Sequence, residues 1–382
     1  MDNHNIKTEQ KNRIKNKKLN IPLLYSLSGL ARNIHVWLAG LISNEMLLLT
    51  TEMVIMGISL IAFLVLLCFF LGYMERRVAA FMEIRLGPNR VGPKGTLQIV
   101  ADTVKLLLKE GLTPDLSDKF LFNLAPLIVV ITSMLVIAPI AFAKDFQLWD
   151  INIGVLYVSS VSSIAVIGIL MAGWASNNKY SLLGAMRSGA QIVSYELSVG
   201  LSLISIVILS GSLSLSDIVY SQSNGWWIFK GHIPIIISFV IFVIASTAEI
   251  NRAPFDMAEA DQELTGGFNT EYAGMKFAMF LLSEYINLFV VSAIAATIFL
   301  GGWMPFHIGG WEAFNHIMDY IPSFFWFMGK TFFIIFIIMW FRWTFPRLRV
   351  DQLLSLEWKY LLPISMVNTI LITVMAIMGW HF

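Results

Sequence analysis

Eight long apolar stretches, separated by polar connections, dominate the hydrophobic pattern of this 382-residue chain. Each stretch is about 17 to 24 residues long. A helix that rises about 1.5 Å per residue needs roughly this length to cross the 30 Å hydrocarbon core of a bilayer. Lipid cannot satisfy an open sheet edge, so we predict an all-α polytopic membrane protein. The predicted spans are 53–73, 121–142, 153–175, 197–215, 233–249, 277–300, 324–343 and 360–380.

Two further segments have a weaker helical pattern. Segment 97–112 places apolar residues at helical spacing and puts Asp102, Lys105 and Lys109 largely on another face, which predicts an amphipathic helix at the membrane surface. Segment 21–43 is moderately apolar but is interrupted by charged and polar residues, which favours an interfacial helix over a signal peptide or a ninth span. We therefore divide the chain into a basic N-terminal extension, 1–45, and a membrane domain, 46–382.

Composition agrees with a membrane protein and limits the chemistry. Hydrophobic residues make up 57% of the chain, and its mean hydropathy of +0.72 is too high for one soluble core. A formal net charge of +1 gives no argument for nucleic acid. The single cysteine, Cys68, excludes an intrachain disulfide, thiolate-bound zinc or an iron–sulfur cluster ligated by this chain alone. The histidines avoid the middle of the spans, which excludes a bis-histidine haem.

The basic residues predict the orientation of the chain in the membrane. They are concentrated in the first, third, fifth and seventh connections, whereas the second and fourth hold only Lys144 and Lys230 and the sixth holds none. The positive-inside rule then makes the odd-numbered connections cytoplasmic. An even number of spans places both termini outside, in conflict with the basic residues of the first 18 positions. We follow the connections, because they outnumber one tail.

The first connection carries a motif that combines cations with an irregular backbone. Glu75-Arg76-Arg77 is followed by RLGPNRVGPKG at 85–95, in which glycine and proline force turns. Such a loop beside a membrane either lines a site or anchors the chain by its positive charge. A phosphate-binding loop is excluded, because Pro93 lacks an N–H and no Ser or Thr follows Lys94.

The fifth connection is acidic. The stretch 249–272 carries six carboxylates and a single arginine, Arg252, and is broken by Pro254 and by the Gly266-Gly267 pair. Crowded carboxylates near a low dielectric repel one another, so the pKa of some of them should rise toward neutral pH. This pattern is typical either of proton transfer or of a solvated loop.

Ionisable residues also lie within or at the ends of the spans, at Glu196, Glu249, Glu284 and Lys330. Each costs at least about 2.5 kcal/mol at mid-bilayer if it faces lipid, so each should face protein or water. They are therefore either members of a proton relay or paired structural charges.

These loops are where the chain resembles the H subunit of respiratory complex I, the NADH-quinone oxidoreductase, called subunit 1 in mitochondria. The resemblance covers roughly residues 50–380 and leaves the first 45 outside. The segments that carry it are RLGPNRVGPKGTLQIVADTVKLLLKE, WASNNKYSLLGAMRSGAQIVSYE, NRAPFDMAEADQELTGGFNTEYAGMKF, LLSEYINL and PRLRVDQLLSLEWKYLLP.

The resemblance implies a translocase subunit in a bacterial cytoplasmic membrane. In this family the subunit and adjoining hydrophilic subunits form a cavity that admits quinone, and electrons arrive from FMN and iron–sulfur clusters in partner subunits. Antiporter-like membrane subunits are the other expected partners, and no cofactor is expected on this chain. The residues expected to bind quinone are Arg76, Arg77, Arg85, Asp102 and Lys105. Those expected to couple protons are Glu196, Glu249, Arg252, Asp256, Glu259, Asp261, Glu263, Glu271, Glu284 and Lys330.

The expected mechanism is a conformational and electrostatic coupling. Quinone reduction adds two electrons and demands two protons, so it should shift the protonation and position of the acidic segment after Pro254. Gly266 and Gly267 are sterically permissive hinge positions. Many relatives carry Glu where this chain has Asp261, whose side chain is one methylene shorter.

Two other functions fit parts of the pattern. A membrane subunit of a related hydrogenase or formate hydrogenlyase would share much of the sequence, but the NRVGP and GFNTEY segments favour complex I. A stand-alone secondary transporter would also carry intramembrane acids, but no inverted repeat is evident. The choice between ubiquinone and menaquinone stays open, because it depends on a cavity shared with partners.

Overall fold

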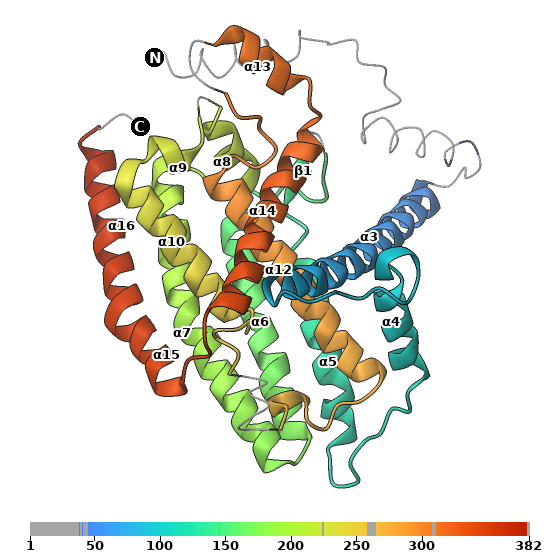
Figure 1. Ribbon diagram of the computed structural model, residues 1–382. Coiled ribbons are helices and arrows are strands. Elements are labelled where there is room, and N and C mark those ends of the chain that lie inside the picture. The colour runs from blue at the N-terminus through green and yellow to red at the C-terminus, as the bar shows by residue number, and fades with distance from the viewer. Residues whose placement is uncertain are drawn as a thin grey trace. The chain divides into compact units, whose positions relative to one another are not determined.

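The computed structural model describes residues 38, 40, 45–144, 146–223, 225–257, 265–307 and 311–379. The chain divides into two units, residues 1–61 and 62–382. Helix α3 (Glu45–Met82) runs through the boundary, and its first half is the described helix of the first unit. The predicted interfacial helix at 21–43 lies outside the described residues, apart from Leu38 and Gly40. The remaining elements belong to the second unit (Figure 1).

In the described part of the chain, seven helices are long and apolar enough to cross a membrane. They confirm a multi-pass, all-α membrane protein. The second predicted span corresponds to a shorter apolar helix, α5 (Lys119–Leu135), which is 17 residues long. Besides α3, the long spans are α6 (Gly154–Ala175), α7 (Lys179–Ser210), α10 (His232–Glu249), α12 (Met275–Phe299), α14 (Ser323–Thr344) and a final span that joins α15 (Val350–Leu356), η4 (Glu357–Leu361) and α16 (Leu362–Ile377).

Four predicted spans have different bounds in the structure. The first begins at Glu45 and ends at Met82 rather than at 53 and 73, and the last begins at Val350 rather than at 360. Helix α5 ends at Leu135 rather than at 142, because Pro139 lacks an N–H and disfavours helix before it. The chain instead forms a small antiparallel pair, β1 (Ala141–Ala143) and β2 (Phe146–Gln147). Helix α7 begins at Lys179 rather than at 197, so most of the predicted third connection is helical.

The early start of α7 follows from its sequence. The Asn178 side chain caps the helix by accepting a hydrogen bond from the backbone N–H of Tyr180, at 2.9 Å. Small residues then allow close packing, because a Cβ at Gly173 of α6 would lie only 2.3 Å from that of Ala185. Lys179 and Arg187 lower the local hydropathy of this helix, which is why the apolar pattern alone placed its start too late.

The second unit is a bundle in which sequence neighbours pack on one another. Helix α5 packs on α6, α6 on α7, and α7 on both α10 and α16, while α12 packs on α5 and α14 (Figure 1). The described residues that follow the acidic stretch form η3 (Gly267–Asn269), a short turn buried among α5, α6, α7 and α12. Its neighbour Tyr272 stacks on Phe122 with ring centroids 4.1 Å apart.

Short elements complete the connections. The amphipathic helix predicted in the first connection is present as α4 (Gln98–Leu108), preceded by η2 (Pro93–Gly95). Helices α8 (Leu215–Ser221), α9 (Trp227–Lys230) and α13 (Glu312–Asp319) were not predicted.

Candidate functional site

A cavity of about 840 Å³ lies where α3, the loop after it and α4 meet α12 and α14. We call it the basic cavity, because Arg76, Arg85, Arg90 and Arg342 all line it. Its lining also includes the charged side chains Glu75, Arg252 and Glu284. The first sequence motif therefore lines a space of the size of a small-molecule site.

Arg77 shapes this cavity through the loop. Its Nε donates to the Tyr73 hydroxyl at 3.0 Å, and both side chains hydrogen-bond the carbonyl oxygen of Lys94. Gly95 has a φ of +76°, and a Cβ there would lie 2.1 Å from the Pro88 carbonyl oxygen. The loop is thus folded on itself, with a turn that requires glycine.

The other residues predicted to bind quinone divide into two groups. Arg76 pairs with Asp102 at 2.6 Å, which ties α3 to α4, and Arg85 pairs with Glu83. Arg76 and Arg85 line the basic cavity, whereas Arg77, Asp102 and Lys105 do not. Lys105 lies on the exposed face of α4.

A group of charges, most of them buried, forms part of the wall of the basic cavity. Arg252 is 3% exposed and donates from Nη1 to Glu75 Oε1 at 2.7 Å, while its Nε lies 2.7 Å from Glu284 Oε1. Arg342 pairs with the same oxygen of Glu75. The guanidinium of Arg252 also lies 4.8 Å from the ring centroid of Tyr285. We call these five residues the charged cluster.

Arg252 stays charged in this setting. Burial opposes its positive charge, but the carboxylates of Glu284 and Glu75 outweigh burial and raise the pKa of Arg252 above its ordinary value. Backbone geometry directs the side chain there, since α10 ends at Glu249 and Asn251 takes a left-handed φ of +57°. Gln191 of α7 then holds the turn, donating to the carbonyl oxygens of Ala248 and Phe255, both at 2.7 Å.

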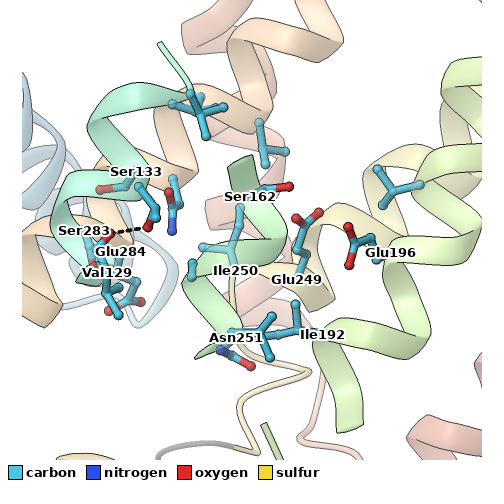
Figure 2. A pocket seen from close by; sticks show the side chains of 18 of the residues that line it. Val129, Ser133, Ser162, Ile192, Glu196, Glu249, Ile250, Asn251, Ser283 and Glu284 are labelled. Atoms are coloured by element: carbon cyan, nitrogen blue, oxygen red, sulfur yellow. Dashed lines mark hydrogen bonds between the residues drawn. The ribbon is translucent and has the colours of Figure 1, made fainter. Parts of the chain in front are cut away.

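A second cavity, of about 120 Å³, lies between α5, α6, α7, α10 and α12. We call it the acidic cavity, because Glu196, Glu249 and Glu284 line it together with serine and threonine side chains. Figure 2 shows Glu249 and Glu196 side by side and Glu284 on a separate helix beside Ser283. The volume has room for a few water molecules, each of about 30 Å³ in the liquid.

Glu284 lines both cavities. One of its oxygens meets Arg252 in the charged cluster, and the same side chain borders the space that holds Glu249 and Glu196. Ser163 of α6 donates to Glu196, which fixes that carboxylate on the cavity wall. The arrangement allows a change of charge in the basic cavity to reach the acidic cavity through one side chain.

Comparison with known proteins identifies the family. The profile of the NADH dehydrogenase family matches residues 55–373. The chain is 54% identical to the NADH-quinone oxidoreductase H subunit of Bacteroides fragilis over 359 residues, which is 94% of this chain and 100% of that protein. It is 55% identical to the H subunit of Bacteroides thetaiotaomicron over 331 residues, which is 87% of this chain and 92% of that one. This chain belongs to the H-subunit family of NADH-quinone oxidoreductase.

A relative from another bacterium is more distant. NADH-quinone oxidoreductase subunit 8 of Rhodothermus marinus is 47% identical over 327 residues, covering 82% of this chain and 95% of that protein. Both cavities of this H-subunit family member belong to the region that the family profile matches, since all their lining residues fall between 75 and 343.

The structure brings together four of the residues predicted to couple protons in this member of the H-subunit family. They are Glu196, Glu249, Arg252 and Glu284, as described above. Asp256 lies nearby and pairs with Arg347 at 3.2 Å. Glu259, Asp261 and Glu263 lie outside the described residues, so their predicted role rests on the sequence.

Two predicted residues lie apart from the acidic cavity. Glu271 accepts a hydrogen bond from Asn178 Nδ2 at 2.6 Å and lines a separate surface pocket beside Asp115 and Lys179. Lys330 is buried in α14 and donates to the carbonyl oxygens of Leu300, Gly302 and Met304, at 2.6, 2.9 and 2.6 Å.

Three members of the charged cluster were not among the residues predicted for the site. Glu75 belonged to the first sequence motif, and Arg342 and Tyr285 lay within predicted spans. A carboxylate and an arginine near the ends of apolar stretches signal an intramembrane pair, but these two partners lie 267 positions apart in the chain. Among the described residues, no three His, Cys, Asp or Glu side chains form a group that could hold a metal ion.

Proposed function

We propose that the chain is the membrane subunit of a proton-translocating NADH:quinone oxidoreductase, forms part of its quinone cavity and couples quinone reduction to proton pumping. Membership of the H-subunit family supports the oxidoreductase complex. The single observation that carries the coupling role is the position of Glu284, which borders both the basic and the acidic cavity.

The basic cavity is the proposed quinone side. A quinone headgroup has two carbonyl oxygens that gain negative charge on reduction, and cations close to them favour that charge. Arg76 and Arg85 line the cavity and can play this part. The electrons come from FMN and iron–sulfur clusters of partner subunits, so this chain supplies the walls of the site and the groups that respond to the charge.

The charged cluster is the proposed switch. Arg252 and Arg342 share one oxygen of Glu75, and Arg252 also holds Glu284. A new negative charge in the basic cavity attracts the arginines and weakens their hold on the carboxylates. Glu284 then takes up a proton, because a buried carboxylate that has lost its cation is higher in free energy than the neutral acid.

The acidic cavity is the proposed start of the proton path. A few waters in it would join Glu284 to Glu249 and Glu196 by hydrogen bonds. From there the change would pass to antiporter-like membrane subunits, together with movement of the acidic segment after Pro254. We assign the odd-numbered connections, which carry most of the basic residues, to the cytoplasmic side, where the hydrophilic partner subunits bind.

The substitution Glu284→Gln tests this function in membranes that hold the whole complex. The amide keeps the shape of the side chain but cannot accept or release a proton, so quinone reductase activity and proton pumping should both fall about tenfold or more, in line with the loss of a positioned acid–base group. NADH oxidation by an artificial acceptor that bypasses quinone should stay normal.

Asp115→Asn is the control, because Asp115 is an exposed carboxylate that lines the surface pocket apart from the acidic cavity and was not predicted to couple protons. Its pumping and quinone reduction should remain within twofold of the unmodified complex. Normal pumping in Glu284→Gln membranes would contradict the proposed route through both cavities.

A further inference from the structure

Glu357 is a buried carboxyl that lies outside both cavities. It opens η4, a single turn of π-helix between α15 and α16, and its side chain has no exposed surface. Turns of this kind are rare in helices and often occur at functional sites. Glu357 therefore needs an explanation that the proposed proton path does not supply.

The two oxygens of Glu357 have different surroundings. Ser198 of α7 donates a hydrogen bond to Oε1, whereas Oε2 is buried and has no hydrogen-bond partner among the described residues. The phenol of Tyr195, which interacts electrostatically with Glu357, uses its hydroxyl to donate to the carbonyl oxygen of Leu353, at 3.0 Å. Half of the carboxyl is thus without a donor.

No cation compensates a negative charge at this place, among the described residues of the elements that pack on η4. On α7, Tyr195 faces Glu357, and Glu196 is turned to the acidic cavity. Asp351 on α15 and Lys359 on η4 are exposed, and α16 carries no ionisable side chain. A buried carboxylate with one donor and no cation is costly, but a neutral acid is not.

The same segment contacts the loop that leads into the acidic stretch. The backbone N–H of Leu348 donates to the carbonyl oxygen of Pro254 at 3.1 Å, and Arg347 pairs with Asp256 at 3.2 Å. The ring of Tyr195 also lies 5.8 Å from that of Phe255. A movement of α15 relative to α7 would therefore displace residues 254–256, at the start of the acidic segment.

We propose that Glu357 is a proton-binding site separate from the acidic cavity, and that its bound proton fastens α15 and α16 to α7. In the closed arrangement the carboxylic O–H bond is intact and the group is neutral. When the segment opens, water reaches the carboxyl, the proton passes to water, and the resulting carboxylate resists reburial. The site goes beyond the proposed route through Glu284 and does not depend on it.

Amide hydrogen exchange in the purified intact complex tests the site. The measured quantity is the opening equilibrium of residues 350–361 between pH 5.5 and 9, after correction for the intrinsic pH dependence of exchange. In the unmodified protein the opening should increase with pH, by up to about tenfold per unit, because only the opened carboxyl gives up its proton. In Glu357→Gln the opening should not change with pH, since the amide is a permanently neutral isostere.

Two further variants make the result specific. Asp351→Asn removes an exposed carboxyl from the same segment and should leave the pH dependence of the unmodified protein unchanged. Ser198→Ala removes the one donor that the described residues supply to the Glu357 carboxylate, so the closed carboxyl should keep its proton to a higher pH and the rise of opening with pH should continue further up the range. Proton pumping is not the readout, which keeps this test separate from that of Glu284.

Three outcomes would overturn the proposal. The first is an equal pH dependence in the unmodified protein and in Glu357→Gln. The second is opening of the segment, or loss of the assembled complex, in Glu357→Gln at neutral pH, because the working form would then be the carboxylate. The third is a Ser198→Ala variant in which the rise of opening levels off at a lower pH than in the unmodified protein.

Discussion

Two buried cations of this bundle, Arg252 and Lys330, have opposite kinds of partners. Arg252 binds two carboxylates, Glu75 and Glu284, which can themselves gain a proton. Lys330 binds three backbone carbonyl oxygens beyond the end of α12 and lies 4.2 Å from the ring centroid of Trp226. Carbonyl oxygens do not titrate, so the partners of Lys330 are constant. The partners of Arg252 can therefore respond to a change of charge nearby, whereas those of Lys330 cannot.

The comparison bears on the role that the sequence predicts for Lys330. Lys330 was predicted to couple protons because it lies within an apolar span. Its contacts favour an anchor that holds the residues after α12 against α14, and the role in proton coupling stays a prediction. Three experiments can separate the switch from the anchor.

The largest effect is expected from Arg252→Leu. This change leaves the carboxylates of Glu75 and Glu284 without their shared cation, and breaking one side of a buried ion pair costs about 3–5 kcal/mol. Quinone reductase activity of the assembled complex should fall more than tenfold. Arg252→Lys is the control, because an ammonium keeps the charge but cannot hold both carboxylates with a fixed fork, so it should recover only part of the activity. Full activity of Arg252→Leu would contradict a switch at this place.

A smaller effect of a different kind is expected from Lys330→Met. The methionine fills much of the space but leaves three carbonyl oxygens without their donor, which should cost about 2–3 kcal/mol. The thermal midpoint of the complex should fall, while the number of protons pumped per quinone reduced should be unchanged. Gly329 is the neighbouring residue, and a methyl group added there would meet open space. Gly329→Ala is therefore the control for a substitution in this turn of α14 that removes no hydrogen bond. Normal stability with lost pumping would instead support the relay role of Lys330.

The smallest effect is expected at the ion pair between Asp256 and Arg347. Arg347 is 46% exposed, so solvent screens the pair and its worth should be below about 1 kcal/mol. A double-mutant cycle with Asp256→Asn and Arg347→Gln measures the coupling through the thermal midpoint. A coupling well above this value would mean that the pair is buried in the assembled complex, and would extend the switch to the α14–α15 connection.

Much of the fold follows from the hydrophobic pattern. The positions of α6, α10, α12 and α14 were predicted to within a few residues, because a long apolar run between polar residues has few alternatives in a membrane. Helix α7 was predicted too short, since small residues rather than strongly apolar ones pack its first half. Local hydropathy measures partition into lipid and does not register packing of helix on helix.

The residues of the candidate site were predictable where a charged side chain stands alone in an apolar stretch of sequence. Glu196, Glu249 and Glu284 are charges in or beside apolar runs, and each lines the acidic cavity. The pairing of Arg342 with Glu75 was not predictable, because their contact depends on how distant helices pack. Glu357 escaped notice for a related reason, since it lies just before a predicted span among polar residues, yet it is fully buried.

The close approach of Gly184 to Gly267 fixes the residues that follow the acidic segment against α7. A Cβ at Gly184 would lie 2.7 Å from the Cα of Gly267, so α7 and η3 meet backbone to backbone. Gln191, seven residues further along α7, holds the carbonyl oxygen of Phe255 on the other side of the segment. Two turns of a single helix, about 10 Å, therefore hold described residues on both sides of positions 258–264. The described residues on both sides of positions 258–264 thus rest on α7, so a displacement of either side acts on that helix.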